Sequence, residues 1–307
     1  MNDDLTDKIH FSAFAMARII HPAENAHYKF KRVRFLLRSL LYRRVLKQMF
    51  FLFQEERLRT LPEKHRELLD KTLRPYQIAN SSARVRAQRV EEHYRLLLRR
   101  YPNLIEPLFL ESGIELGRYP DNFNRVILRY DGVFRREGEL VLSVVDEAGK
   151  RLYSCAFSLA GTAEQLHLII GSVQGPEPAV DQAQEKVRIM TKGAYGLRPK
   201  SLVVLGVLMI AKALGAEQVM AVKKNAHVFQ AKRYSKKQKG KVQLDYDELW
   251  SEFEARDVDS NFVLLPQLTR KPLEEIVSKK RSMYRRRYEW LDTFAANIYS
   301  LFGTVTG

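Results

Sequence analysis

The sequence predicts an α+β protein in which a helical amino-terminal region precedes a mixed β-sheet with a parallel crossover. Apolar side chains recur at helical spacing in the first third of the chain, and short β-rich runs separated by turn residues follow from about residue 119. Two apolar runs, 166–170 and 218–222, flank two helix-like segments, which is the order of a parallel crossover. We expect a helical basic region over residues 1–115 and an α/β domain with a basic carboxyl-terminal helix over residues 116–307.

The composition is that of a folded, strongly basic protein. The chain has 307 residues, of which 45% are hydrophobic and 29% charged, and its formal net charge is +16. This charge predicts polyanionic partners: an acidic or phosphorylated ligand, an anionic membrane surface or, less favoured, nucleic acid. The single cysteine, Cys155, excludes a disulfide framework and a cysteine-rich zinc site, and we expect no metal. Cys155 lies in an apolar strand and is interpreted as a core residue.

The amino terminus and the hydropathy pattern predict the location. The chain begins with three aspartates within seven residues and lacks a basic segment followed by an apolar run, so no secretory signal is predicted. The longest apolar runs, such as 202–210, are much shorter than the roughly 20 residues that span a bilayer. We expect a cytoplasmic protein, and its charge is compatible with a peripheral position at the inner membrane.

Residues 30–53 predict a basic amphipathic helix with aromatic side chains. Apolar residues including Phe30, Leu37 and Leu40 recur at helical spacing, and Lys and Arg occupy the remaining face. One interpretation packs the apolar face on the rest of the protein, and the other lays the helix on a membrane surface or on nucleic acid. A second helix is expected from Ser82 to Arg100, and Pro and Gly residues from 102 to 120 indicate a domain boundary.

The second region predicts a meander and then the crossover. Strands are expected at 125–130, 140–145 and 151–159, with Gly149 in a hairpin turn. The next strand, 166–170, runs into a segment from Gly171 to Pro176 that we interpret as a tight Gly-rich turn. Two helices lead to the strand 218–222, an acidic-aromatic helix is expected over 245–253, and a cationic helix over 273–294.

A meander of three strands, a helix and a parallel strand is the order found in the acyl-CoA-dependent N-acyltransferase fold, which the chain resembles in this respect. In that fold a helix amino terminus holds the cofactor pyrophosphate, because free amide groups and the helix dipole favour an anion. Pro199 suits the first position of such a helix, but the usual Gln/Arg-x-x-Gly-x-Gly/Ala loop is missing. The alternative is that 196–199 only turns the chain into a core helix. The predicted residues for binding CoA or an acyl-carrier thioester are Gln174, Gly175, Gly193, Gly196, Arg198 and Lys200.

Two residues are candidates for proton transfer. His227 follows the second parallel strand beside cations, which suits a general base or a phosphate contact. Tyr234 lies in a loop, 223–241, that contains eight Lys and Arg residues and no acid. The loop is interpreted as a nucleic-acid contact, a receptor for an acidic lipid or nucleotide, or a solvated surface. No Walker loop, Ser-His-Asp signature, zinc-ligand cluster or kinase motif is present.

Several motifs in order resemble the VirK/YbjX family of Gram-negative bacteria. They are Ile170-Gly171-Ser172-Val173-Gln174-Gly175-Pro176, Gly196-Leu197-Arg198-Pro199-Lys200, Ala221-Val222 with His227, Asp245-Tyr246-Asp247-Glu248-Leu249-Trp250 and Phe262-Val263-Leu264-Leu265-Pro266. The resemblance covers residues 20–295 and implies a role in virulence, in surface presentation of an outer-membrane virulence protein and in resistance to antimicrobial peptides. It implies no defined activity and no catalytic residue.

These observations lead to one main hypothesis and two alternatives. The main hypothesis is an acyltransferase that uses a thioester donor and an amine or hydroxyl acceptor related to the cell envelope. The first alternative is a non-enzymatic envelope factor that binds anionic lipid or a protein partner through its basic faces. The second is a nucleic-acid-binding protein. The sequence leaves open whether the protein is an enzyme.

Overall fold

The computed structural model describes residues 10–120, 123–235 and 244–303. The chain forms two compact units, the first from residues 1–74 and 82–91 and the second from residues 75–81 and 92–307. The helix α5 (Ala83–Arg100) begins in the first unit and ends in the second, and it confirms the helix predicted over 82–100. Within the described residues, no helix is long and apolar enough to cross a membrane.

The first unit is helical, as predicted. Its elements are α1 (Ala13–Ile20), α2 (Ala26–Leu41), α3 (Arg43–Leu52), α4 (Leu61–Lys64) and two short 3-10 helices, Arg66–Leu69 and Lys71–Leu73. Ser12 and Asn25 cap α1 and α2, because each side chain accepts a hydrogen bond from a backbone N–H of the first turn. The single helix predicted over 30–53 is two helices, since the chain bends at Tyr42 between α2 and α3.

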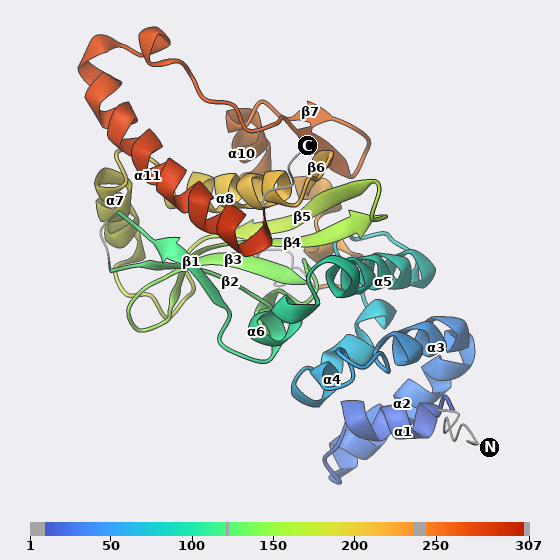
Figure 1. The fold of residues 1–307 in the computed structure, drawn as a ribbon. Helices are drawn as coiled ribbons and strands as arrows, with labels where there is room; N and C mark the ends of the chain where they lie inside the picture. The colour runs from blue at the N-terminus through green and yellow to red at the C-terminus, as the bar shows by residue number, and fades with distance from the viewer. Residues whose placement is uncertain (1–9, 121–122, 236–243, 304–307) are drawn as a thin grey trace, which may run out of the picture. The chain divides into compact units, whose positions relative to one another are not determined.

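The second unit contains one eight-stranded sheet in the order β1-β2-β3-β4-β5-β6-β8-β7 (Figure 1). Its strands are β1 (Ile114–Arg118), β2 (Arg125–Arg129), β3 (Leu140–Val145), β4 (Arg151–Gly161), β5 (Leu166–Gln174), β6 (Gln218–Val222), β7 (Arg256–Asp257) and β8 (Phe262–Leu265). Among the strands of the described residues, only β5 and β6 pair in parallel, and every other neighbouring pair is antiparallel. The predicted meander, its Gly149 hairpin and the parallel crossover are confirmed, with Gly149 at a φ of 76°.

The tight turn predicted at Gly171 is wrong, because β5 continues through Gln174. The register shifts at this point: Ala156 pairs with Ser172 and Phe157 with Ile170, so Gly171 forms a β-bulge. A Cβ atom at Gly171 would overlap the carbonyl oxygen of Glu137, and one at Gly138 would lie 2.6 Å from the backbone nitrogen of Phe157. Glycines at these two positions therefore allow the segment before β3 to lie directly against the sheet.

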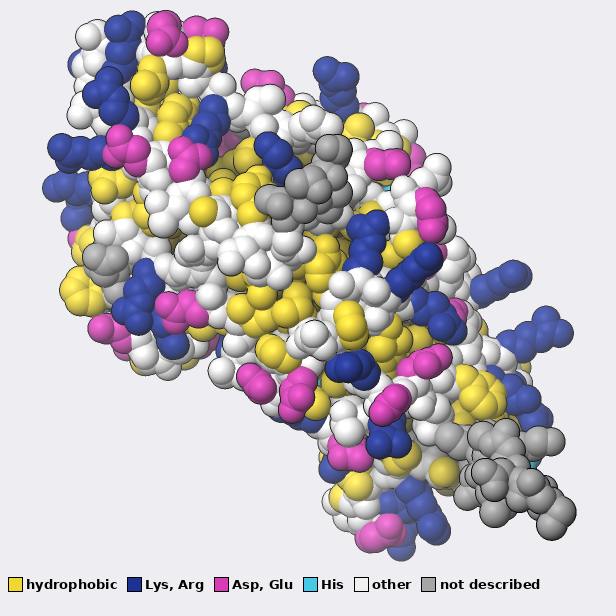
Figure 2. Space-filling view, in the orientation of Figure 1, with side chains coloured by type: hydrophobic (Ala, Val, Ile, Leu, Met, Phe, Trp, Pro, Cys, Tyr) yellow, Lys and Arg dark blue, Asp and Glu magenta, His cyan; other side chains and the backbone are white. Residues whose placement is uncertain are grey.

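The helices of the second unit follow from the pattern of apolar residues. They are α6 (Ile105–Phe109), α7 (Ala183–Gly193), α8 (Pro199–Ala213), α10 (Tyr246–Glu252) and α11 (Ser278–Phe302). The nearly all-apolar α8 packs on β3, β4 and β5, and α11 packs on α8 and β1 (Figure 1). A Cβ atom at Gly206 would lie 2.4 Å from Leu142, so this glycine lets α8 approach the sheet closely. Figure 2 shows Lys and Arg side chains gathered where Figure 1 draws the start of α11, as its cationic sequence predicts.

Candidate functional site

The parallel pairing of β5 and β6 stops before the ends of the strands. Its last pair is Ile170 with Ala221, and the following backbone groups bond side chains of α10 instead. The Tyr246 hydroxyl accepts from the Val173 N–H at 3.0 Å and donates to the Val173 carbonyl at 3.1 Å. The Trp250 indole N–H donates to the Val222 carbonyl at 3.0 Å. Two aromatic side chains of α10 thus form hydrogen bonds with backbone groups at the strand ends, which would otherwise need a neighbouring strand as their partner.

Three polar side chains meet beside these strand ends, and we refer to Glu137, Gln174 and His227 as the polar cluster. The Gln174 amide donates to Glu137 Oε1 at 2.6 Å, and His227 Nε2 lies 3.6 Å from the same oxygen. Glu137 is fully buried, and His227 is 1% exposed. An acid and an imidazole at this distance, held out of water at the carboxyl ends of parallel strands, form an arrangement suited to proton transfer.

One ring nitrogen of His227 accepts a hydrogen bond, and this bond assigns the tautomer of the neutral ring. Its Nδ1 accepts from the Phe229 backbone N–H at 3.3 Å, so in the neutral ring the proton lies on Nε2. Nε2 lies 3.6 Å from Glu137 Oε1, which is too far for a hydrogen bond, and the same oxygen accepts the Gln174 amide. The second oxygen, Glu137 Oε2, is buried and accepts no hydrogen bond from the described part of the chain. Oε2 is therefore the carboxylate oxygen of the polar cluster that has no hydrogen-bond partner among the described residues.

Other buried polar atoms around the cluster also lack hydrogen bonds within the described residues: Ser172 Oγ and both amide atoms of Gln77. The Gln77 backbone N–H donates to the Arg136 carbonyl, and Ile78 forms a β-bridge with His227, so Gln77 lies beside the cluster. Gln77 also has a φ of 56°, a strained conformation for a residue other than glycine. Unsatisfied polar atoms and local strain are unfavourable for stability, and their concentration here is typical of a functional site.

Tyr246 connects the strand ends to the polar cluster. Its ring centroid lies 5.6 Å from that of His227. Burial, followed by the nearby Glu137, raises the pKa of the Tyr246 hydroxyl well above its usual range, so this hydroxyl stays protonated and donates to Val173. Burial likewise raises the pKa of the Cys155 thiol, which agrees with its interpretation as a core residue.

The predicted proton-transfer residue Tyr234 lies in a neighbouring apolar cluster with Ala79, Ala231 and Phe229. The Arg136 guanidinium lies over its ring, 5.1 Å from the centroid. The Tyr234 hydroxyl is buried and makes no hydrogen bond to any described residue. Residues 236–241 of the basic loop in which we predicted it lie outside the described residues.

The predicted phosphate-binding residues line a separate hollow of about 560 Å³ at the amino end of α8. Within the part of the chain that the structure describes, its wall contains Arg188, Lys192, Arg198 and Lys200 and no acidic residue, which suits an anionic group. Pro199 occupies the first turn of α8, as predicted. However, Arg198 and Lys200 both bind the Glu252 carboxylate of α10, at 3.2 and 2.9 Å. Glu252 thus occupies the cations that a phosphate would use.

The structure divides the predicted site residues into two groups. Gln174 and His227 come together through Glu137, whereas Gly196, Arg198 and Lys200 surround the hollow. Gly175 lies between the two groups: it follows Gln174, and a Cβ atom there would lie 3.7 Å from Tyr153, which lines the hollow. Gly193 ends α7 and has no close neighbour.

Sequence reasoning missed Glu137, Tyr246 and Glu252 as parts of the site. Glu137 lies before β3 in sequence and reaches β5 only because Gly171 permits its backbone to approach. The adjacent Gly138 was the available signal, but a Glu-Gly pair in a loop does not predict a buried acid. The helix that contains Tyr246 and Glu252 was predicted, but its contacts with the strand ends and with Arg198 and Lys200 were not.

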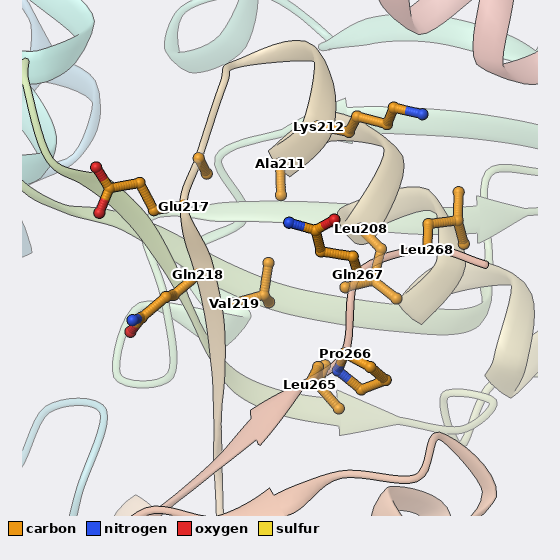
Figure 3. Close-up of a pocket in the computed structure, with 11 residues that line it drawn as sticks. Leu208, Ala211, Lys212, Glu217, Gln218, Val219, Leu265, Pro266, Gln267 and Leu268 are labelled. Atoms are coloured by element: carbon orange, nitrogen blue, oxygen red, sulfur yellow. The ribbon is translucent and has the colours of Figure 1, made fainter.

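The amino ends of the same strands have a different environment. A hollow of about 180 Å³ there is lined mostly by apolar side chains of α8, β6 and the segment after β8, including Leu208, Val219 and Leu265. Figure 3 shows Glu217 and Gln218 pointing away from this hollow. Among the described residues, no group of three or more His, Cys, Asp and Glu side chains is arranged to hold a metal ion.

Comparison with known proteins identifies the family. The model of a family described as "Protein of unknown function (DUF535)" matches residues 24–300. The chain is 29% identical over 288 residues to the uncharacterized protein YbjX of Escherichia coli, covering 92% of this chain and 86% of that one. It is 33% identical over 222 residues to an uncharacterized protein of Haemophilus influenzae, covering 72% of each chain. No solved structure matches the chain significantly. The chain therefore belongs to the DUF535 family, which is the VirK/YbjX family, and the predicted resemblance is confirmed.

Proposed function

We propose that this DUF535 protein is an acyltransferase that moves an acyl group from a thioester to an amine or hydroxyl. The observation that carries the proposal is the buried polar cluster: Gln174 donates to one oxygen of Glu137, His227 lies 3.6 Å from that oxygen, and the other oxygen has no hydrogen-bond partner among the described residues. The sheet supports it further, because an antiparallel meander followed by a crossover to a parallel strand is the arrangement of the acyl-CoA-dependent N-acyltransferase fold.

The reaction assigns each side chain of the cluster a role. The acceptor nitrogen or oxygen attacks the thioester carbonyl carbon, a C–N or C–O bond forms and the C–S bond breaks. Glu137 Oε2 takes the proton of the acceptor, and that proton passes to the departing thiolate, so the products are the acylated acceptor and a free thiol. Gln174 and His227 act as positioning residues that orient the Glu137 carboxyl group. No covalent enzyme intermediate is required, which agrees with a buried, inert Cys155.

The positive charge of the residues around the hollow matches the negative charge of the phosphate groups of CoA or of an acyl carrier. Lys192, Arg198 and Lys200 would hold these groups, and the bound thioester would supply the activated acyl carbon. The space between the ends of β5 and β6 fits a thioester arm less well, because Tyr246 and Trp250 bond the strand ends there. The proposal therefore requires α10 to move when a donor binds, and displacement of Glu252 by phosphate is the step that would release it.

Calorimetric titration with CoA, palmitoyl-CoA and palmitoylated acyl carrier protein tests the proposal. We expect at least one of the three to bind, and Arg198→Ala/Lys200→Ala to weaken binding by about tenfold or more. Asp292→Asn, which disrupts the unrelated Arg270–Asp292 pair, is the control and leaves binding unchanged. If none of the three ligands binds, or if the double variant binds as well as the wild type, the proposed donor site is wrong.

The second arm of the test concerns the chemistry. With a binding donor and a panel of simple amines and alcohols, release of thiol is measured for the wild type and for Glu137→Gln. We expect the variant to retain donor binding and to lose about 100-fold or more of the rate. An unchanged rate would exclude Glu137 as the base while leaving the donor site intact.

A further inference from the structure

The helix α2 of the first unit exposes an apolar face. Its large apolar side chains on this face are exposed by 64, 55, 62, 76 and 81% of their surface, and they belong to Phe30, Val33, Leu37, Leu40 and Leu41. These residues are separated by intervals of three, four, three and one, so they lie on one side of the helix. Scattered exposed apolar residues are ordinary, but five on one face of one helix form a continuous patch.

The opposite side of α2 explains why the apolar face points outward. Phe35 and Ser39 are buried there. Arg32 is anchored as well, since its guanidinium donates to the carbonyls of His21, Pro22 and Ala23 and binds Glu24 at 2.8 Å. Packing and hydrogen bonds within the first unit thus hold the inner side of α2. The outer face contributes little to this packing, so its five apolar residues remain exposed for contact with another surface.

The charge of α2 indicates what this face contacts. The helix contains five Lys and Arg residues and no Asp or Glu. By helical spacing, exposed Lys29 and Arg34 lie on either side of the apolar face. An apolar face bordered by cations is the pattern of a helix that lies in the interface of an anionic bilayer. A second copy of the chain is disfavoured as a partner, because it would bring the same cations against each other.

We propose that the apolar face of α2 docks on an anionic lipid surface, with Phe30, Leu37, Leu40 and Leu41 inserted among the acyl chains. Lys29 and Arg34 contact the phosphate headgroups. This proposal uses residues remote in sequence from the polar cluster, and it does not depend on the proposed acyl transfer. It gives the basic amphipathic segment of the sequence a specific partner.

Vesicle flotation with the full chain tests the proposal. We expect the wild type to float with vesicles of phosphatidylcholine and phosphatidylglycerol, and much less with phosphatidylcholine alone. Leu37→Ser/Leu40→Ser removes two inserted side chains and is expected to lower the partition coefficient by at least about tenfold. The matched control is Ile189→Ser/Val258→Ser, because these residues are also exposed, by 56 and 53%, but lie in the second unit. It is expected to float as the wild type does, and circular dichroism melting checks that both variants fold.

Two further measurements locate the contact and its charge dependence. Phe30→Trp is expected to give a blue-shifted fluorescence change on addition of the anionic vesicles, whereas Val258→Trp is not. Lys29→Gln/Arg34→Gln is expected to weaken binding about tenfold at low salt and less at high salt. The proposal is overturned if the wild type does not bind the anionic vesicles or if Leu37→Ser/Leu40→Ser binds equally well. It is also overturned if that variant only converts a dimer to a monomer, which would identify the face as a contact between copies.

Discussion

The two ends of the β5–β6 pair are built from the same strands but have opposite chemistry. At the amino end, the ladder is complete: His167 pairs with Gln218, the Glu217 N–H donates to the Leu166 carbonyl, and the small hollow above them is mainly apolar (Figure 3). At the carboxyl end, the ladder stops, aromatic side chains of α10 bond the strands, and the polar cluster is buried with atoms that lack hydrogen bonds. Buried polar atoms without hydrogen bonds lower the stability of a fold, so we interpret the carboxyl end as the candidate functional end of this strand pair.

The largest expected effect concerns the glycine that brings Glu137 to the sheet. Gly171→Ala would place a Cβ atom onto the Glu137 carbonyl oxygen. The new Cβ atom is attached directly to the backbone of β5 and the oxygen belongs to the backbone of Glu137, so the overlap cannot be relieved by rotating a side chain. We expect a loss of at least about 3 kcal/mol in the free energy of unfolding, measured by urea denaturation. Gly193→Ala is the control: Gly193 has free space around it at the end of α7 and should gain or lose no more than about 1 kcal/mol. Equal effects at the two positions would contradict the close approach of Glu137.

The next largest effect concerns the hydrogen bonds that α10 makes to the carboxyl end of β5. Tyr246→Phe removes the hydroxyl that satisfies both backbone groups of Val173, and we expect a loss of about 2–4 kcal/mol in urea denaturation. Tyr288→Phe removes a hydroxyl that donates to the Lys271 carbonyl at an exposed position, and a change below about 0.5 kcal/mol is expected. If the two variants are equally stable, the strand ends do not depend on Tyr246.

A smaller effect is expected from the acid that occupies the phosphate-binding cations. Glu252→Gln releases Arg198 and Lys200, so the affinity for pyrophosphate should rise about three- to tenfold in calorimetry at low salt. The Asp292→Asn variant again serves as the control, with no change expected. A fall in affinity for the Glu252 variant would mean that this carboxylate helps to form the hollow and does not compete with the ligand.

The smallest effect is expected at the amino end of the strands. Gln218→Ala/Gln267→Ala changes two exposed side chains beside the apolar hollow, where the backbone ladder is already complete. The free energy of unfolding should change by less than about 0.5 kcal/mol, and donor binding should not change. A loss of donor binding would move the candidate site to this end of the sheet.

The sequence was sufficient for the order of elements because each strand and helix of the crossover has its own local pattern. The runs 166–170 and 218–222 are mainly apolar, and both are strands of the parallel pair. It was insufficient at Gly171, where a run of Gly, Ser, Gln and Pro resembles a turn but continues the strand. The difference comes from the backbone of Glu137 packing on the bulge, which is a tertiary contact.

The candidate site was also predictable only in part, because some of its residues meet only through tertiary contacts. His227 was found because it follows a strand, and Gln174 because it lies in the Gly-rich segment that was interpreted as a turn. Glu137 belongs to no pattern, and its separation from Gln174 along the chain is bridged only in the folded sheet. The pairing of Glu252 with both Arg198 and Lys200 likewise depends on how α10 packs, which the spacing of its residues does not encode.

The most direct test of the central claim is the free energy of unfolding of Glu137→Gln, which needs no knowledge of the substrate. The glutamine carbonyl can still accept the Gln174 amide, and the change removes a buried carboxyl oxygen that has no hydrogen bond. If the cluster is kept for function, the variant should be as stable as the wild type or up to about 2 kcal/mol more stable. A loss of more than about 2 kcal/mol would show that Glu137 holds the fold together and would contradict its assignment as the reactive group.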